Sequence, residues 1–273
     1  MNYPKFSVLM SVYIKEKSEY FKECMDSILN QTVKPDEIVI VFDGPISDNL
    51  NLMINKYCEE NRGLIKLIKN KNNKGLGLAL ADGVPNCSYD LIARMDTDDI
   101  AVEDRFERQL KMFVNDPNLD ICGSHIIEFE GNIDNVISYR KVPILHEDIV
   151  EYQKQRSAFN HMTVMYKKDS VLKAGNYEHC PLMEDDMMWV RLILSGAKCV
   201  NIDDYLVYAR TGEAMIRRRG GLDYFKKYRE ARKKIFKTGF ISKWDYYKTL
   251  LVQMIVALVP GQLRFFIFKK LLR

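Results

Sequence analysis

The sequence lacks closely spaced cysteine pairs. Its six cysteines are scattered along 273 residues, and no two of them form a CxxC pair. A chain of this length buries enough surface to fold without disulfides, so we expect six reduced thiols and a reducing, cytoplasmic location. The first residues, MNYPKFSVLMSVYIKEK, also lack a signal peptide's order of basic start, apolar stretch and small-residue cleavage site. We therefore do not expect a secreted protein.

The sequence also lacks a long uninterrupted apolar run. Its most apolar segment, residues 250–273, is broken by Pro260 and Gly261 and carries interleaved lysines and arginines. This pattern favours a helix lying in a membrane interface over a helix that spans the bilayer. A C-terminal helix pair that packs on the rest of the chain is the alternative.

A strong overall charge is missing as well, because 41 Lys+Arg against 37 Asp+Glu leave a net charge of only +4. The positive excess gathers after Arg210, which indicates an anionic partner, either a phosphate-bearing substrate or a membrane surface. Neither zinc-finger spacing nor an RNA-binding aromatic signature accompanies the charge. We therefore expect no nucleic acid as partner.

Short runs of Val, Ile and Leu alternate with helical patterns in the first hundred residues. The runs are FSVLMSV (6–12), EIVIVF (37–42), LIKLIK (64–69) and DLIARM (90–95). The helical patterns between them are Phe21, Cys24, Met25 and Ile28, then Leu52, Met53, Lys56 and Tyr57. This alternation predicts an α/β fold with a mostly parallel sheet flanked by helices. Later strands are expected at 120–129, 163–167 and 198–202, and a helix is expected to end at Gly196.

Ligands of open parallel sheets gather beyond the carboxyl ends of the strands. The polar residues and glycines at the four predicted ends are Ser11 and Tyr13, Asp43 and Gly44, Asn73 and Gly75, and the acidic group Asp96, Asp98 and Asp99. Three carboxylates so close together repel one another unless a cation lies between them. Oxygen ligands of this kind are typical of Mg²⁺ or Mn²⁺ that also binds substrate phosphates. Helix capping by Asp98 or Asp99 is the alternative.

Two further groups border predicted helices. NNKGLGLALADG (72–83) is a glycine-bearing turn suited to a diphosphate, but Leu80 replaces the third glycine of a dinucleotide fingerprint. Close packing is an equal alternative role for Gly77. In MEDD (183–186), acidic residues in a first helical turn are favoured by the helix dipole alone. A functional role for this second group requires that it face the group at Asp96.

Six segments in register carry a family resemblance. FSVLMSVY, SILNQTVKPDEIVIVFDG, NKGLGLAL, ARMDTDDIAVEDRFERQ, HMTVMYK and MEDDMMWVRL together resemble the family 2 inverting glycosyltransferases of GT-A fold, especially bacterial enzymes of O-antigen and capsular polysaccharide synthesis. The resemblance covers about residues 4–210. It implies a Rossmann-like GT-A nucleotide-sugar domain over 1–210, followed by a basic, helical, membrane-interfacial region over 211–273.

The resemblance also implies roles for single residues. Asp43 is expected to bind the uracil of a UDP-sugar, Asp96 its ribose or sugar, and Asp98 a metal, with Asp96 as a possible second ligand. Asp185, beside Glu184, matches the catalytic base. The complete set expected to bind the nucleotide sugar is Ser11, Tyr13, Asp43, Asn73, Gly75, Arg94 and Asp96. Candidates for contact with the acceptor or a diphosphate are His161, Arg210, Arg217 and Arg218.

The sequence departs from the family pattern in two places. The usual DDG reads Phe42-Asp43-Gly44, and the helix that often reads ARN is Ala79-Leu80-Ala81, so Arg94 is the candidate replacement for the missing arginine.

The resulting hypothesis is an inverting, Mn²⁺- or Mg²⁺-dependent enzyme. It moves a hexose, glucose or galactose, from UDP to a polyprenyl-diphosphate-linked sugar at the inner face of the bacterial cytoplasmic membrane, and forms a β-linkage. Two other interpretations stay open at this point. One is a sugar-phosphate nucleotidyltransferase, although the expected basic glycine-rich signature after Val12 is missing. The other is a non-catalytic, membrane-associated scaffold of the same fold.

Overall fold

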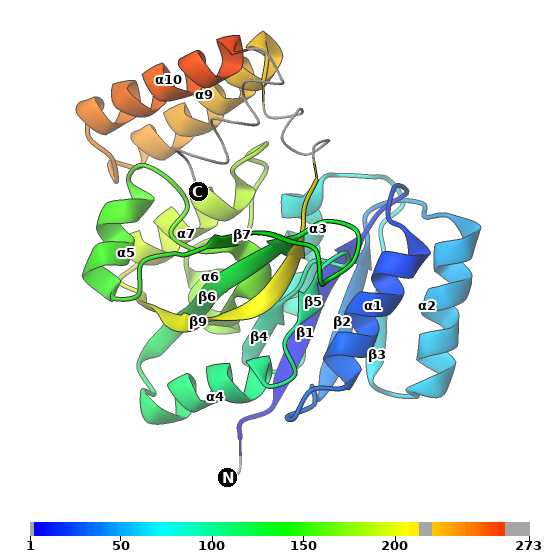
Figure 1. Cartoon of the computed structure of the whole chain (residues 1–273). Helices are drawn as coiled ribbons and strands as arrows, with labels where there is room; N and C mark the ends of the chain where they lie inside the picture. The colour runs from blue at the N-terminus through cyan, green and yellow to red at the C-terminus, as the bar shows by residue number, and fades with distance from the viewer. Residues whose placement is uncertain (1–2, 213–219, 260–273) are drawn as a thin grey trace.

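The computed structural model describes residues 3–212 and 220–259, and its centre is one mixed nine-stranded sheet (Figure 1). The strand order is β3-β2-β1-β4-β8-β6-β9-β5, with β7 paired to β6. The strands are β1 Phe6–Val12, β2 Glu37–Phe42, β3 Ile65–Lys69, β4 Leu91–Arg94, β5 Ile100–Ala101, β6 Leu119–Phe129, β7 Val136–Arg140, β8 Met165–Lys167 and β9 Lys198–Arg210.

The first four predicted strands form the parallel half of the sheet. β1 pairs in parallel with β2 and β4, and β2 pairs in parallel with β3. Ser11 is in register with Val41, so the ends of β1 and β2 lie level with each other. The predicted gathering of strand ends at one edge of the sheet is therefore confirmed.

The second half of the sheet departs from a parallel arrangement. β8 pairs antiparallel with both β4 and β6, and β5 pairs antiparallel with β9. β6 and β9 run in parallel along their whole length, and this pairing extends β9 to Arg210, beyond the predicted 198–202. The expected parallel sheet is thus correct for β1 to β4, whereas the sheet as a whole is mixed.

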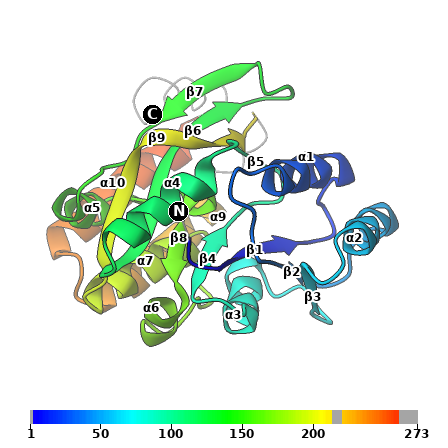
Figure 2. The same cartoon turned by 90° about the horizontal axis from the view of Figure 1, so that it is seen from below.

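Helices cover both faces of the sheet (Figures 1 and 2). The helices of the described residues are α1 Ser18–Leu29, α2 Asp48–Glu60, α3 Leu76–Asn86, α4 Arg105–Asn115, α5 His146–Gln153, the 3-10 turn η1 His161–Thr163, α6 Lys168–Lys173, α7 Glu184–Leu194, and, beyond the sheet, α9 Leu222–Lys237 and α10 Lys243–Leu258. α2 buries Leu50, Ile54 and Tyr57, whereas Leu52 is 67% exposed. The predicted helix is therefore confirmed, and of the residues that indicated it Tyr57 is buried whereas Leu52 faces solvent.

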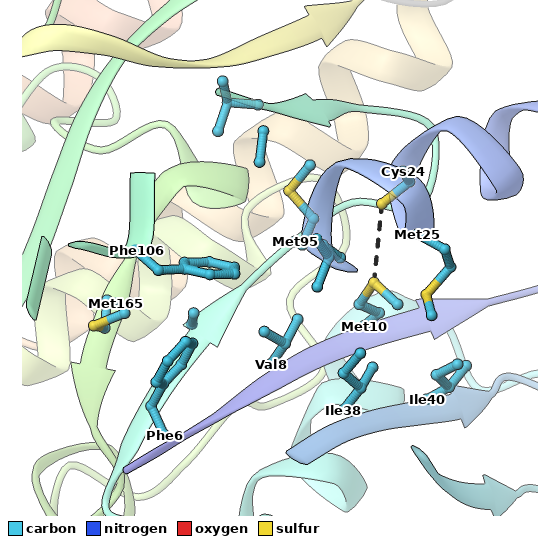
Figure 3. Close-up of a cluster of buried hydrophobic side chains, with 14 of the residues drawn as sticks. Phe6, Val8, Met10, Cys24, Met25, Ile38, Ile40, Met95, Phe106 and Met165 are labelled. Atoms are coloured by element: carbon cyan, nitrogen blue, oxygen red, sulfur yellow. Dashed lines mark hydrogen bonds between the residues drawn. The ribbon is translucent and has the colours of Figure 1, made fainter. Parts of the chain in front are cut away.

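Side chains alternate across β1 and divide the core in two. Phe6, Val8 and Met10 meet α1 and α4 on one face, where Phe6 packs edge-on against Phe106 (Figure 3). Leu9 points to the other face, which α3, α6 and α7 cover. All six cysteines are unpaired, as expected, and Cys24 contributes its thiol to the first core, 4.0 Å from the Met10 sulfur.

The two C-terminal helices form a pair that packs on the main body. The amide of Gly221, before α9, donates to the carbonyl of Ala257 near the end of α10, so the helices are antiparallel. Val190 of α7 packs with Ile235 of α9 and Ile241 between the two helices. Among the residues that the structure describes, no helix is long and apolar enough to cross a membrane. The first part of the expected interfacial stretch, 250–259, belongs to α10 and the residue after it, whereas 260–273 lies outside the described residues.

Candidate active site

The turns after β2 and β3 are locked together. The Asp43 carboxylate accepts hydrogen bonds from the backbone amides of Lys74 (2.6 Å) and Gly75 (3.0 Å), and Asn73 donates its side-chain amide to the Asp43 carbonyl. Gly44 has a φ of +83°, and an added Cβ would lie 2.6 Å from the Asn73 amide nitrogen. Three predicted nucleotide-binding residues, Asp43, Asn73 and Gly75, are thus brought together at the start of α3.

Arg94, at the end of β4, is fully buried and pairs with the Asp96 carboxylate. Burial opposes ionisation of Asp96, but the adjacent Arg94 and His161 outweigh it and hold the pKa of Asp96 below its usual range. Asp96 therefore remains an anion inside the protein. The Nε and Nη2 atoms of Arg94 have no protein partner in the described residues.

His161 joins the two acidic groups that lie far apart in sequence. Its Nε2 lies 3.1 Å from the Asp96 carboxylate, and its Nδ1 lies 3.2 Å from the Asp185 carboxylate. The η1 turn holds the ring in place, because Asn160 donates to the carbonyl of Ser124, and Thr163 accepts from the amide of the same residue. The group at Glu184–Asp186 thus faces the group at Asp96, which is the condition that sequence could not test.

Two carboxyl groups at the start of α7 bind protons unusually well. Burial raises the pKa of Asp185, although His161 and Arg94 oppose the shift. Burial and the Asp185 charge raise the pKa of Glu184 to about 7. These properties suit Asp185 to proton transfer in a water-poor site.

Close helix packing fixes the beginning of α7. A Cβ on Gly77 of α3 would lie only 2.8 Å from the Glu184 Cβ and 3.0 Å from the Glu178 carbonyl oxygen. The packing role considered for Gly77 is therefore confirmed, with a helix start rather than a strand as its partner. Asp186 accepts a hydrogen bond from Gln153 of α5 (2.9 Å), which anchors the same turn from its other side.

Asp98 and Asp99 have different surroundings. Asp99 is buried and accepts the backbone amide of Arg210 (2.7 Å), while the Arg210 Nε donates to the Asp98 carbonyl (3.0 Å). The suggested helix-capping role of Asp99 is wrong, because Asp104 occupies the N-cap of α4 and Asp99 ties its turn to β9 instead. Burial, together with Asp96 and Glu16, raises the pKa of the Asp98 carboxyl to about 7.

The Asp98 carboxylate offers oxygen atoms of the kind that Mg²⁺ and Mn²⁺ prefer as ligands. Asp96 is engaged by Arg94 and His161, whereas Asp98 has no ion pair with any described residue and shares its surroundings with two other acids. Within residues 3–212 and 220–259, no three Asp, Glu, His or Cys side chains converge closely enough to hold a metal by themselves. A cation bound here would therefore rely on Asp98 and on substrate phosphates, as Mg²⁺ commonly does.

One cavity of about 1070 Å³ connects these groups with the C-terminal helices. Its acidic wall contains Asp96, Asp98, Asp99, Asp185 and Asp186, with His161 between them. Its basic wall contains Arg140, Arg156, Lys227, Arg232 and Lys248. This volume exceeds that of most single-ligand pockets, so the cavity has room for two substrates. Sequence reasoning did not select these five basic residues. The only signal was the excess of positive charge after Arg210, which indicated an anionic partner but no particular residue.

The remaining predicted residues are placed around the same edge. Ser11 is half-buried, and its carbonyl faces the Thr97 hydroxyl at 3.5 Å, whereas Tyr13 is 38% exposed beyond β1. Arg210 is held against the rings of Tyr20 and Phe129, and it lines the cavity. Arg217 and Arg218 lie outside the described residues.

Sequence reasoning also missed Glu16, which accepts a hydrogen bond from Thr97 (2.7 Å) and lies near Asp98. Its position shortly after β1, at a strand end, was the signal that could have found it.

A mixed sheet with this strand-end acidic cluster has the architecture of the GT-A glycosyltransferases. The chain superposes on the mannosyltransferase PcManGT from Pyrobaculum calidifontis, solved with GDP-Man and Mn²⁺, with a TM-score of 0.65. The match covers 96% of this chain and 72% of that one at 14% identity, so it supports the fold alone.

Sequence comparison places the chain within one family. Residues 7–175 match the model of glycosyl transferase family 2. The amylovoran biosynthesis glycosyltransferase AmsE of Erwinia amylovora is 35% identical over 269 residues, which cover 97% of this chain and 98% of that protein. A UDP-Gal:alpha-D-GlcNAc-diphosphoundecaprenol beta-1,3-galactosyltransferase of Escherichia coli is 35% identical over 270 residues, 99% and 97% of the two chains. The chain therefore belongs to glycosyl transferase family 2 and is a glycosyltransferase, as the resemblance implied.

Proposed function

We propose that this enzyme transfers a hexose from a UDP-sugar to a saccharide that is linked to a lipid through a diphosphate. The observation that carries the proposal is the position of His161 between Asp96 and Asp185. In this arrangement the turn at Asp96, which is expected to bind the donor, and Asp185, the expected base, line the same cavity. Direct transfer requires this proximity, because donor and acceptor must meet with their reacting atoms in contact.

The donor end of the proposal rests on the strand-end turns. Asp43 and the turn at Asn73 and Gly75 would receive the nucleotide, and Asp96 would face the ribose or the sugar. Asp98 would hold Mn²⁺ or Mg²⁺. The bound cation would supply positive charge to the leaving diphosphate, where negative charge develops during transfer.

The chemistry of the transfer depends on Asp185. Its carboxylate would take the proton of the acceptor hydroxyl while that hydroxyl attacks the anomeric carbon and the bond to the UDP oxygen breaks. One displacement inverts the configuration, so an α-linked UDP-hexose gives a β-linked product. A double displacement would require a nucleophilic carboxylate on the opposite face of the sugar. The E. coli relative bears the name of a β-1,3-galactosyltransferase, which supports galactose as the first donor to test.

The acceptor end of the proposal rests on the basic wall. Lys227, Lys248 and Arg156 line the same cavity as the carboxylates, where they would attract a second anionic group in addition to the donor diphosphate. A diphosphate-linked lipid is the acceptor in the name of the E. coli relative, and AmsE is named for amylovoran biosynthesis. We therefore place the reaction at the inner face of the bacterial cytoplasmic membrane, in surface polysaccharide synthesis. Family membership favours this reaction over nucleotidyl transfer.

The test is a transfer assay with purified enzyme. UDP-galactose, UDP-glucose and their N-acetylated forms are each incubated with Mn²⁺, Mg²⁺ or EDTA and an N-acetylglucosamine-diphosphate-lipid acceptor. The expected product is a β-linked disaccharide, identified by NMR of the anomeric proton, and EDTA should abolish it. Asp98→Ala and Asp185→Ala should lose nearly all transfer while remaining folded. An α-linked product, or full activity in either variant, would contradict the mechanism.

A further inference from the structure

α10 presents large apolar side chains to solvent along its whole length. They are Trp244 (75% exposed), Tyr247 (65%), Leu251 (63%), Ile255 (54%) and Leu258 (67%), together called the α10 stripe. Their spacing of three or four residues places them on one face of the helix. The other side of α10 buries Thr249, Val256 and Ala257. Contiguous exposed apolar surface of this kind marks an interaction site in a soluble protein.

The charge around the α10 stripe indicates what covers it. The neighbouring helix α9 exposes six cationic side chains, Lys226, Lys227, Arg229, Lys233, Lys234 and Lys237, against two acidic ones, Asp223 and Glu230. Residues 260–273, which continue the chain directly after α10, contain four further cations and no acid. A second copy of this chain would bring the same positive charge and be repelled, whereas an anionic surface would be attracted.

The composition of the α10 stripe fits a lipid headgroup region. Trp and Tyr prefer the boundary between water and hydrocarbon, and Trp244 and Tyr247 stand together at the beginning of the helix. Leu251, Ile255 and Leu258 provide apolar surface for shallow insertion of the helix parallel to the membrane. Apolar residues combined with flanking lysines are the usual makeup of such helices.

The α10 stripe borders the mouth of the cavity. Lys248 and Val252 are exposed beside the α10 stripe, and both also line the cavity. An acceptor anchored in a lipid layer under the α10 stripe would therefore have its diphosphate close to the basic wall. This relationship connects the outer surface of α10 with the site of transfer.

We propose that the α10 stripe docks on an anionic lipid surface and holds the cavity mouth against it. The role given to this docking depends on the proposed function, because docking would bring the enzyme to a lipid-linked acceptor. The docking itself needs no substrate, so it can be measured alone.

The first experiment measures binding of the full chain to vesicles. Vesicles of phosphatidylglycerol and phosphatidylcholine are compared with vesicles of pure phosphatidylcholine in a flotation assay. The wild type should bind the anionic vesicles, and Leu251→Glu/Ile255→Glu should bind them at least about tenfold more weakly, because it removes apolar area and adds negative charge. Leu52→Glu is the control, since Leu52 is 67% exposed, at least as much as Leu251 and Ile255, and α2 lies far from α10 (Figure 1). It should bind like the wild type.

The second experiment separates docking from catalysis. The double variant should transfer sugar normally to a short-chain acceptor dissolved in water, but poorly to a long-chain acceptor embedded in anionic vesicles. Equal vesicle binding by wild type and double variant would overturn the proposal. So would a wild-type dimer that the double variant converts to a monomer in sedimentation, because the α10 stripe would then be a contact between copies. If the wild-type enzyme transfers sugar to neither acceptor, the proposed function is wrong. The vesicle-binding measurement still decides whether the α10 stripe docks on lipid.

Discussion

The carboxylates of Asp96 and Asp185 face the two nitrogens of one imidazole ring, at 3.1 and 3.2 Å. The first carboxylate follows β4 and the second lies in the first turn of α7, so the ring of His161 is the physical link between the turn after β4 and the start of α7.

Replacing His161 by Asn should therefore lower kcat by about a hundredfold, because Asp185 loses the group that fixes its orientation. The KM for the donor should change little, and the melting temperature should stay near that of the wild type. His179→Asn is the control, since this histidine is exposed on a loop before α7. Steady-state kinetics with both variants checks the prediction, and an unchanged kcat in His161→Asn would refute a positioning role.

Removal of the Asp98 charge should weaken metal-dependent binding of the nucleotide. Asp98→Asn keeps the shape of the side chain but removes an anionic oxygen ligand, so affinity for UDP in the presence of Mn²⁺ should fall by at least about tenfold. Titration calorimetry with and without Mn²⁺ measures this directly. Asp104→Asn, a surface carboxyl at the start of α4, should behave like the wild type. Metal-independent UDP binding in the wild type would contradict the assignment.

The buried arginine at the end of β4 should matter for folding as well as for the site. Arg94→Met leaves the partly buried Asp96 carboxylate without its main partner, which should cost about 3 kcal/mol of the free energy of unfolding. Arg108→Met breaks two pairs with Asp104 and Asp204 on the surface and should cost less than about 1 kcal/mol. Urea denaturation of both variants compares them, and equal losses would show that Asp96 is compensated by other groups.

The pH dependence of transfer should report the raised pKa of Asp185. The base must be ionised to accept a proton, so kcat should decrease as the pH falls through that raised pKa, at a higher pH than for an ordinary aspartate. Asp186 contributes to the shift by charge repulsion, so Asp186→Asn should move the acidic limb of the kcat profile to lower pH. If the acidic limb of the kcat profile does not move in Asp186→Asn, the pH dependence of kcat reports a group other than Asp185.

The first half of the fold was predictable because its signals are local. β1 and β2 have the bounds that their apolar runs predict, and the polar strand ends lie at one edge because parallel strands require it. Leu52 shows the limit of the same reasoning, since a helical pattern gives a period but several candidate faces. The strands β5 and β7 escaped prediction because β5 has only two residues and β7 depends on its pairing with β6.

The candidate site was predictable as a list of residues but not as an arrangement. Asp96, Asp185 and His161 were each selected, yet their contact depends on how α7 and η1 pack, and packing has no signature in the sequence. Asp99 is the clearest case, because its partner is the backbone amide of Arg210 at the far end of β9. The cations that α9 and α10 contribute to the basic wall depend in the same way on the packing of these helices against α7.

Asp43 has a consequence for the way the enzyme handles negative charge. The amides of Lys74 and Gly75 lead into α3, where helix geometry offers an anion a ready place, and the Asp43 carboxylate already occupies it. The protein's own Asp43 carboxylate thus occupies the position in which nucleotide-binding sheets often bind a phosphate. A donor diphosphate would therefore find its counter-charge elsewhere, and at the neighbouring edge the negative charge of Asp96 and Glu16 around Asp98 is offset only in part by Arg210. In the proposed mechanism, a cation at Asp98 would reach the site together with the diphosphate whose charge it offsets.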